Sequence, residues 1–190
     1  MVALGLSGHG HPAHRAGLQP AGRIPARHSG PEAETVITVR PAREQDSRLL
    51  EAVWHASFMA SYATFMPESY VRGVLESDVI GKLARKKWDE CFIAEVDGQP
   101  GAVMQLTDNY VAELWTHPDH QKKGAASALL DHAEKMAAQR GFDTLTLCTY
   151  GRNTQAREFY RKRGFAVHRT EASDRVPDDI VCHKVKRLAG

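Results

Sequence analysis

Residues 111–140, near the middle of the chain, constrain the fold more than any other stretch. A short apolar run, Val111 to Thr116, is typical of a strand and ends before Pro118, which has no N–H to continue a ladder. A loop of small and basic residues follows, and then an amphipathic run from Ala125 to Arg140 with apolar residues at helical spacing. A strand that leads through such a loop into a helix presents unpaired N–H groups at the positive end of a helix dipole. The stretch therefore predicts an anion-binding turn.

The residues of this loop narrow the kind of site. Gly124 leaves space for a phosphate to approach the backbone. The loop is not a P-loop, because Lys123 precedes the glycine and no second glycine comes before a Lys-Ser/Thr pair. The G-x-G-x-x-G fingerprint of dinucleotide-binding proteins is also absent. An ordinary strand-to-helix turn stays open as the alternative if the loop is considered alone.

A second pattern follows this helix. After the helix stop at Gly141, a strand-like run from Thr144 to Thr149 leads into a helical segment, Asn153 to Arg163. Ala156, Phe159 and Tyr160 share one face of that segment. Gly164 stands where a C-terminal cap is expected.

The two segments together resemble the signatures of the GNAT superfamily of N-acetyltransferases. The first signature, V-x-P-x-x-Q/R-x-x-G-x-G/A, is matched by Thr116, His117, Pro118, Gln121, Gly124 and Ala126. The second, N-x-x-A-x-x-F-Y-x-x-x-G-F, is matched by Asn153, Ala156, Phe159, Tyr160, Gly164 and Phe165. The chain departs from the first signature at Thr116, where the family usually has valine, and at Ala126, where alanine is tolerated in place of glycine. The resemblance covers residues 34–188 as one domain.

The pattern of apolar runs predicts an α+β fold with a mixed, mostly antiparallel sheet and flanking helices. Strands are expected at residues 35–40, 91–96, 101–106, 110–116, 144–149, 165–170 and 180–185, and helices at 43–57, 74–87, 125–140 and 153–163. Asp97-Gly98 indicates a tight hairpin between the second and third strands. The helix at 125–140 would cross over between two parallel neighbours, the strands at 111–116 and 144–149. The resemblance implies that this parallel pair splays apart.

The resemblance also implies the cofactor, acetyl-CoA, whose pantetheine arm would enter between the splayed strands. Tyr160 would stand near the sulfur, and Asn153 would contact the arm. The resemblance implies that further residues of the strand and of the following loop also bind the cofactor. These are Leu114, Trp115, Thr116, Gln121, Lys122, Lys123, Gly124, Ala125, Ala126 and Ser127.

Acyl transfer to an amine sets the remaining chemical requirements. A thioester is already activated, so direct attack by a primary amine in a ternary complex needs no covalent intermediate. An alkylamine with a pKa near ~10.4 is mostly protonated at neutral pH, so a base is useful. Glu113, which strand alternation places on one face with Trp115 and His117, is the first candidate, and a glutamate paired with a lysine is the alternative. His117 is a second candidate base, and Tyr160 could protonate the departing thiolate.

Charge and composition argue against several other classes of protein: nucleic-acid-binding, disulfide-rich and membrane-spanning. The net charge is +2, but three arginines in residues 1–31 account for more than all of it, so the rest of the chain carries no basic excess that would suggest nucleic acid. Residues 1–31 lack apolar periodicity and are predicted to be a disordered basic tail. Three scattered cysteines fit no disulfide framework and favour a reduced, cytoplasmic setting. No run is apolar enough over ~18 residues to span a membrane.

Several questions stay open at this level. A non-catalytic acyl-CoA-binding sensor or scaffold of the same fold is the main alternative, and a metal site on His117 and His120 is a weaker one that lacks a third ligand. The acceptor is a small-molecule or peptide amine, and a homodimer, common in the family, is left open. Acidic residues 174, 178 and 179 hint at a cationic amine. The candidates for lining the acceptor pocket are aromatic: Trp54, Phe58, Tyr62, Phe65 and Tyr70.

Overall fold

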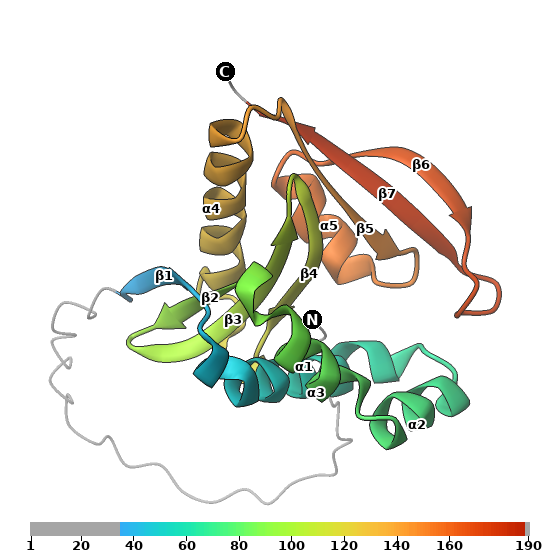
Figure 1. Ribbon diagram of the computed structural model, residues 1–190. Coiled ribbons are helices and arrows are strands. Elements are labelled where there is room, and N and C mark those ends of the chain that lie inside the picture. Colours follow the sequence, from blue (N-terminus) through green and yellow to red (C-terminus); the bar gives the residue numbers. More distant parts are fainter. Residues whose placement is uncertain (1–34, 189–190) are drawn as a thin grey trace, which may run out of the picture. The chain divides into compact units, whose positions relative to one another are not determined.

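A seven-stranded sheet lies at the centre of residues 35–188, the part of the chain that the computed structural model describes (Figure 1). Its order is β1-β2-β3-β4-β5-β7-β6, and every neighbouring pair is antiparallel except β4 and β5. The predicted mixed, mostly antiparallel sheet is thus confirmed. The strands are β1 Ile37–Pro41, β2 Cys91–Val96, β3 Gln99–Thr107, β4 Tyr110–Thr116, β5 Thr144–Tyr150, β6 Ala166–Ala172 and β7 Ile180–Arg187.

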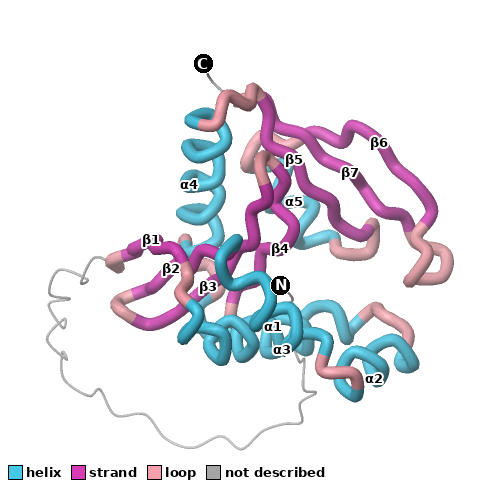
Figure 2. Tube along the Cα trace, in the orientation of Figure 1, coloured by secondary structure: helices cyan, strands magenta, loops and turns pink. Residues whose placement is uncertain are grey.

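Helices cover both faces of the sheet (Figures 1 and 2). α4 and α5 pack on one face, and α1 and α3 pack on the other. The α-helices are α1 Ser47–Ser61, α2 Glu68–Glu76, α3 Val79–Lys87, α4 Ala125–Gln139 and α5 Thr154–Lys162; short 3-10 helices are η1 Glu44–Asp46, η2 Tyr62–Thr64, η3 Trp88–Glu90 and η4 Pro118–His120. None of the helices within residues 35–188 is long and apolar enough to cross a membrane.

The two covered faces explain why β3 is apolar without alternation. Six consecutive residues, Gly101 to Leu106, are buried, because their side chains point alternately toward the two helical layers. On the first face, Leu129 and Leu130 of α4 are fully buried against Met104, and each such side chain contributes about 1.5–3 kcal/mol. On the second face, Leu50 and Trp54 of α1 pack against β2 and β3.

The tight hairpin predicted at Asp97-Gly98 is present. Asp97 has φ 52° and Gly98 has φ 76°, both in the left-handed region that this two-residue turn requires. The turn sets the register between β2 and β3, in which Val96 lies opposite Gln99.

The helix predicted over residues 74–87 is wrong in its extent, because the structure has two helices there. α2 ends at Glu76, and α3 begins at Val79. Asp78 between them has φ 52°, a conformation that a continuous α-helix cannot contain. The helix expected at 43–57 also begins as the 3-10 turn η1 and runs on to Ser61, because its apolar face continues through Phe58.

The expected parting of β4 and β5 is visible in their register. The two strands pair only at Tyr110 with Thr146 and at Val111 with Leu147. β4 carries a bulge just beyond this point, since Gln105 pairs with Glu113 and Leu106 with Val111, which leaves Ala112 as the extra residue. A bulge bends its strand, so β4 turns away from β5, and a fork opens between them (Figure 1). The tail expected at residues 1–31 lies outside the described residues.

Candidate active site

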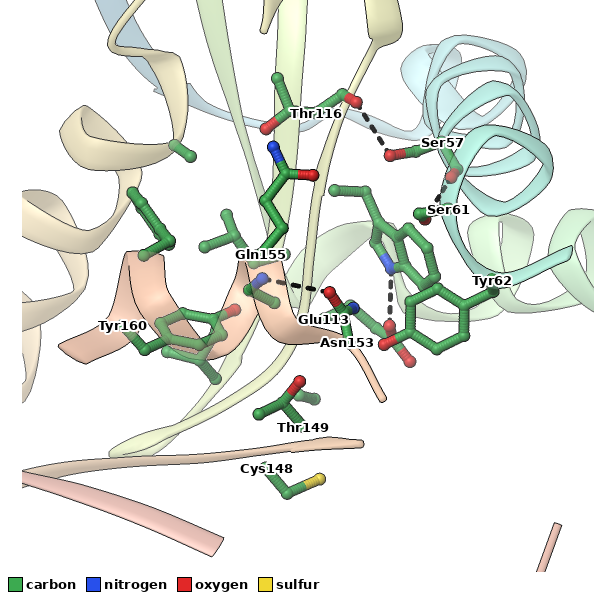
Figure 3. Close-up of a pocket in the computed structure, with 17 residues that line it drawn as sticks. Ser57, Ser61, Tyr62, Glu113, Thr116, Cys148, Thr149, Asn153, Gln155 and Tyr160 are labelled. Carbon is green, nitrogen blue, oxygen red and sulfur yellow. Dashed lines mark hydrogen bonds between the residues drawn. The ribbon is translucent and has the colours of Figure 1, made fainter. Parts of the chain in front are cut away.

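The fork between β4 and β5 opens into a cleft of about 90 Å³. Figure 3 shows side chains from α1, β4, β5 and α5 converging on it. A second, larger pocket adjoins the cleft and is termed the acceptor pocket here because the sequence predicted the acceptor's position in this region. The cleft and this pocket share the residues Tyr62, Ala112, Glu113, Trp115, Cys148 and Thr149. The residues that line the cleft are Ser57, Ser61, Tyr62, Val111, Ala112, Glu113, Leu114, Trp115, Thr116, Ala126, Cys148, Thr149, Asn153, Gln155, Ala156, Phe159 and Tyr160.

The loop before α4 presents a run of free backbone donors. From Lys122 to Ser127, no backbone N–H donates a hydrogen bond to any atom of residues 35–188. The loop reaches this geometry through Lys122 at φ 61° and Gly124 at φ 91°. A Cβ at Gly124 would lie 2.9 Å from Ile37 Cδ1, so both the backbone angle and β1 favour glycine.

Most of the basic side chains near α5 already have partners. Arg163 pairs with Asp131, and Arg161 and Lys162 pair with Glu158. Arg152 donates to the Pro177 carbonyl, and Arg157 donates to that of Gly151. Lys122 and Lys123 of the loop are exposed and, unlike these arginines and Lys162, have neither an ionic nor a side-chain hydrogen-bond partner within residues 35–188. Positive charge available for a phosphate therefore concentrates at the start of α4.

Only every second residue of β4 directs its backbone N–H and C=O toward the fork. The N–H of His117 donates to the carbonyl of Gly101, so Glu113 and Trp115 also direct their backbone groups toward β3. Leu114 and Thr116 consequently direct theirs toward the fork. The Ser57 hydroxyl already donates to the Thr116 carbonyl at 2.8 Å. Of the three β4 residues predicted to offer backbone groups, Leu114 is thus the best placed.

α5 positions the two residues of the second signature. The Asn153 side-chain oxygen accepts the N–H of Ala156 at 3.1 Å and caps the helix. Its amide NH₂ is left facing the cleft, with no partner in the described part of the chain. Tyr160 is buried about two helical turns further on and lines the same cleft. Burial raises the pKa of Tyr160 above its ordinary value, so its phenol stays protonated at neutral pH.

Glu113 stands where the cleft and the acceptor pocket meet. Its Oε2 accepts the indole N–H of Trp115 at 2.6 Å (Figure 3), which agrees with the predicted common face of these two residues. Burial raises the pKa of Glu113 to about 7, against the opposing effects of the Trp115 hydrogen bond and the charge of Arg175. No lysine pairs with it among the described residues. A carboxylate with a pKa near neutrality is suited to accept a proton.

The acceptor pocket is largely apolar. Trp54, Phe58, Tyr62 and Tyr70 line it, as the sequence predicted, together with apolar residues of α2, α3 and β7. The prediction for Phe65 is wrong, because it does not line the pocket and instead packs on Tyr62 and Tyr150. Of the acidic loop residues, Asp174 lines the pocket, whereas Asp179 accepts the backbone N–H of Arg152.

Sequence reasoning missed several residues of the site. Cys148 and Thr149 of β5 line both cavities, and Arg175 of the β6–β7 loop lines the acceptor pocket. The Thr149 hydroxyl is buried and has no hydrogen-bond partner among residues 35–188. Strand alternation in β5 could have placed Thr149 with Leu145 and Leu147 on the inner face, but no sequence signal points to Arg175.

These features fit coenzyme A. The unpaired N–H groups at the start of α4 are the donors that a pyrophosphate needs. The buried Thr149 hydroxyl and the Asn153 amide supply further hydrogen-bonding groups along the fork, where an amide-bearing arm would pass. The described residues hold no group of three or more His, Cys, Asp or Glu side chains that could bind a metal ion, and that includes the surroundings of His117 and His120.

Comparison with known proteins identifies the family. Residues 50–165, more than half of the chain, match the family model described as Acetyltransferase (GNAT) family. The chain belongs to the GNAT family. Peptidyl-lysine N-acetyltransferase YjaB of Salmonella typhimurium is 31% identical over 141 residues, which cover 73% of this chain and 90% of the relative. YjaB of Escherichia coli is 31% identical over 140 residues, or 73% of this chain and 89% of the relative.

Solved structures agree with this GNAT assignment. The apo form of Escherichia coli YjaB superposes with a TM-score of 0.67 at 27% identity and covers 81% of this chain and 99% of its own. A GCN5-related N-acetyltransferase from Rhodopseudomonas palustris gives 0.70 at 24% identity, with 84% and 100% covered. PaiA N-acetyltransferase of Thermoplasma acidophilum, solved with coenzyme A, gives 0.66 at 21% identity, with 80% and 99% covered. The last two likenesses concern the fold.

Membership of the GNAT family confirms two predictions. The chain is an N-acetyltransferase, and its cofactor is acetyl-CoA.

Proposed function

We propose that this GNAT protein transfers the acetyl group of acetyl-CoA to a primary amine by direct attack in a ternary complex. The position of Glu113 is the observation that carries this proposal, because its side chain lines both the cleft and the acceptor pocket. An amine in the pocket and a thioester in the fork would meet beside it. Holding the two reactants there can supply about 7–11 kcal/mol if they are aligned.

Glu113 acts as the base. With a pKa of about 7, it is half ionised at neutral pH and can take the proton that an alkylammonium must lose before it attacks. Neutralising an amine of pKa near ~10.4 at neutral pH costs roughly 4.6 kcal/mol, so a base in contact with the amine lowers a substantial barrier. His117 stands at the far end of β4 and lines neither cavity, which favours Glu113 over it.

Tyr160 donates a proton to the departing sulfur. Its phenol is neutral because burial and the negative charge of Glu113 both raise its pKa. A thiolate whose conjugate acid has a pKa near ~8.5 is already a fair leaving group, so this donation gives a modest gain in turnover.

The cofactor's phosphates bind at the start of α4. The backbone N–H groups of Lys122, Lys123, Gly124, Ala125, Ala126 and Ser127 donate to them, and the two loop lysines add charge. Gln121 precedes this run and orients the loop, and its N–H donates to the Pro118 carbonyl at 3.3 Å. The backbone of Leu114 and the side chain of Asn153 hold the pantetheine arm in the fork, whereas the backbone groups of Trp115 face β3 and the Thr116 carbonyl accepts from Ser57.

A lysine side chain of a peptide is a second candidate acceptor. The two YjaB relatives are named peptidyl-lysine N-acetyltransferases. The apolar walls of the acceptor pocket would also suit the methylene stem of a lysine, which packs on apolar surface while its amine stays polar. The free state of all three cysteines supports a reducing, cytoplasmic setting for such an enzyme, and we propose residues 34–188 as its catalytic domain.

The test is an amine panel with acetyl-CoA that measures release of free thiol. We expect release with at least one primary amine, and loss of most of that release in Glu113→Gln. The matched control is Glu95→Gln, a partly buried strand glutamate that pairs with Arg40 and lines neither cavity. Binding of acetyl-CoA without release on any amine would instead favour the non-catalytic acyl-CoA-binding alternative.

A further inference from the structure

The acceptor pocket contains one cationic side chain that the proposed reaction does not use. Of the described residues that line this pocket, Arg175 is the single lysine or arginine. It lies in the loop between β6 and β7, at the mouth of the pocket. Its charge lowers the pKa of Glu113, so the two residues share the same space.

The loop that carries Arg175 is held in place by several contacts. The Ser173 hydroxyl oxygen accepts the N–H groups of Arg175 at 3.2 Å and Val176 at 2.9 Å. Val176 is buried at 1% exposure and anchors the loop. The Asp179 carboxylate accepts the N–H of Arg152 from the turn after β5. Arg175 is thus presented to the pocket by an ordered loop.

The charge of Arg175 is not neutralised within residues 35–188. The nearest carboxylate is that of Asp174, 4.0 Å from Arg175 Nε, and the Asp174 side chain is 85% exposed. Nη1 donates a long 3.4 Å hydrogen bond to the Tyr70 hydroxyl, and Nη2 has no partner in the described part of the chain. A guanidinium has five donors in a fork that matches a carboxylate, so most of this capacity is unused.

The pocket has three carboxylates besides, of which Asp174 is largely exposed beside Arg175. Glu171 accepts from His183 at 2.9 Å and from Arg169 at 2.7 Å. Glu113 is the proposed base for the amine. The pocket therefore offers one anionic position inside, one cationic position at the mouth, and apolar walls between them.

We propose that the acceptor is a primary amine that also carries a carboxylate and an apolar body, and that Arg175 binds this carboxylate at the pocket mouth. This inference rests on the proposed acetyl transfer and names its substrate class. A free amino acid with an apolar side chain and a peptide lysine beside an acidic residue share this chemistry. It replaces the expectation of a simple cationic amine drawn from the acidic loop residues, because Asp179 accepts the backbone N–H of Arg152 and Arg175 lines the pocket beside Asp174.

The experiment compares acceptors in pairs that differ only in the carboxylate. One arm uses phenylalanine with phenylalaninamide and leucine with leucinamide. The other uses short lysine peptides with glutamate or glutamine next to the lysine. The ratio of kcat/KM for acid over amide is measured in the parent and in Arg175→Gln. The intrinsic reactivity of each amine cancels when the two ratios are compared.

We expect Arg175→Gln to lower this ratio by about tenfold, the effect of losing one charge-assisted contact at a partly exposed site. Arg175→Lys keeps the charge and should give an intermediate ratio, since lysine lacks the fork. Arg72→Gln is the control, because Arg72 on α2 is similarly exposed, at 63% against 56%, and lines neither cavity. If the ratio falls for the amino acids, the carboxylate is that of a free amino acid; if it falls for the peptides, the carboxylate is that of an acidic residue beside the lysine.

The possible outcomes distinguish a failure of the role of Arg175 from a failure of the proposed acetyl transfer. Thiol release with equal ratios in the parent and Arg175→Gln overturns the role of Arg175 and leaves the acetyl transfer standing. Absence of release with every amine overturns the proposed transfer, and this inference with it. A fall in the ratio that Arg72→Gln shows as well also overturns the assignment to Arg175.

Discussion

The indole N–H of Trp115 donates a 2.6 Å hydrogen bond to Glu113 Oε2, two residues back along β4. This bond stabilises the ionised carboxylate, while burial destabilises it, and burial has the larger effect. The balance places the pKa of Glu113 at about 7, where small changes in either influence alter its charge at neutral pH.

Trp115→Phe should therefore shift the pH dependence of the enzyme upward. The variant keeps the aromatic packing against Tyr62 but loses the donor to Glu113, so the pKa of Glu113 rises above about 7. The acidic limb of the kcat/KM profile should move to higher pH by roughly one unit, the effect of one hydrogen bond of about 1.4 kcal/mol. A profile that overlays that of the parent would show that Glu113 does not govern this limb.

Glu113→Gln should stabilise the fold at neutral and alkaline pH. The pKa of Glu113 is raised from its ordinary 4.5 to about 7 in the folded chain, so the folded state holds this proton more tightly than the unfolded state. The stability that this group contributes is greatest below pH 4.5 and is lost as the pH rises to about 7. The variant has no such loss, and its advantage should grow over this window to at most about 3 kcal/mol. Urea melts at pH 4 and pH 8 measure it, and an equal difference at both pH values would contradict the raised pKa.

Tyr160→Phe should lower turnover more than it weakens coenzyme A binding. The ring stays packed against Phe159 and Phe165, while the hydroxyl that would protonate the sulfur is lost. We expect a fall in kcat of about tenfold to a hundredfold, at the lower end of general acid catalysis, with Kd changed by less than threefold. Calorimetry gives Kd, and the thiol-release assay gives kcat. A larger loss in Kd than in kcat would assign the hydroxyl to binding.

Gly124→Glu should abolish coenzyme A binding. The substituted side chain brings negative charge to the unpaired N–H groups at the start of α4, and any Cβ there is strained at φ 91° and close to Ile37. Gly98→Glu serves as the control, because Gly98 also has a positive φ but lies in the hairpin between β2 and β3, with open space around it. Both variants should lose some stability in a thermal melt, and only Gly124→Glu should lose binding in calorimetry. Retained binding in that variant would move the phosphate site away from this loop.

The sequence by itself determined the order of the elements, the parallel pair with its crossover helix, the GNAT signatures at the starts of α4 and α5, and the common face of Glu113 and Trp115. These features depend on residues near one another in the chain, whose periodicity and turn chemistry are local. The break at Asp78 was missed because a left-handed aspartate leaves no strong local signal. Only the tertiary structure decided the contacts between distant segments. It brought Thr149 beside Glu113, paired Arg163 at the end of α5 with Asp131 of α4, and carried Arg175 from the β6–β7 loop to the acceptor pocket. The tertiary structure also decided the pKa of Glu113, because burial depends on what the fold places around a side chain.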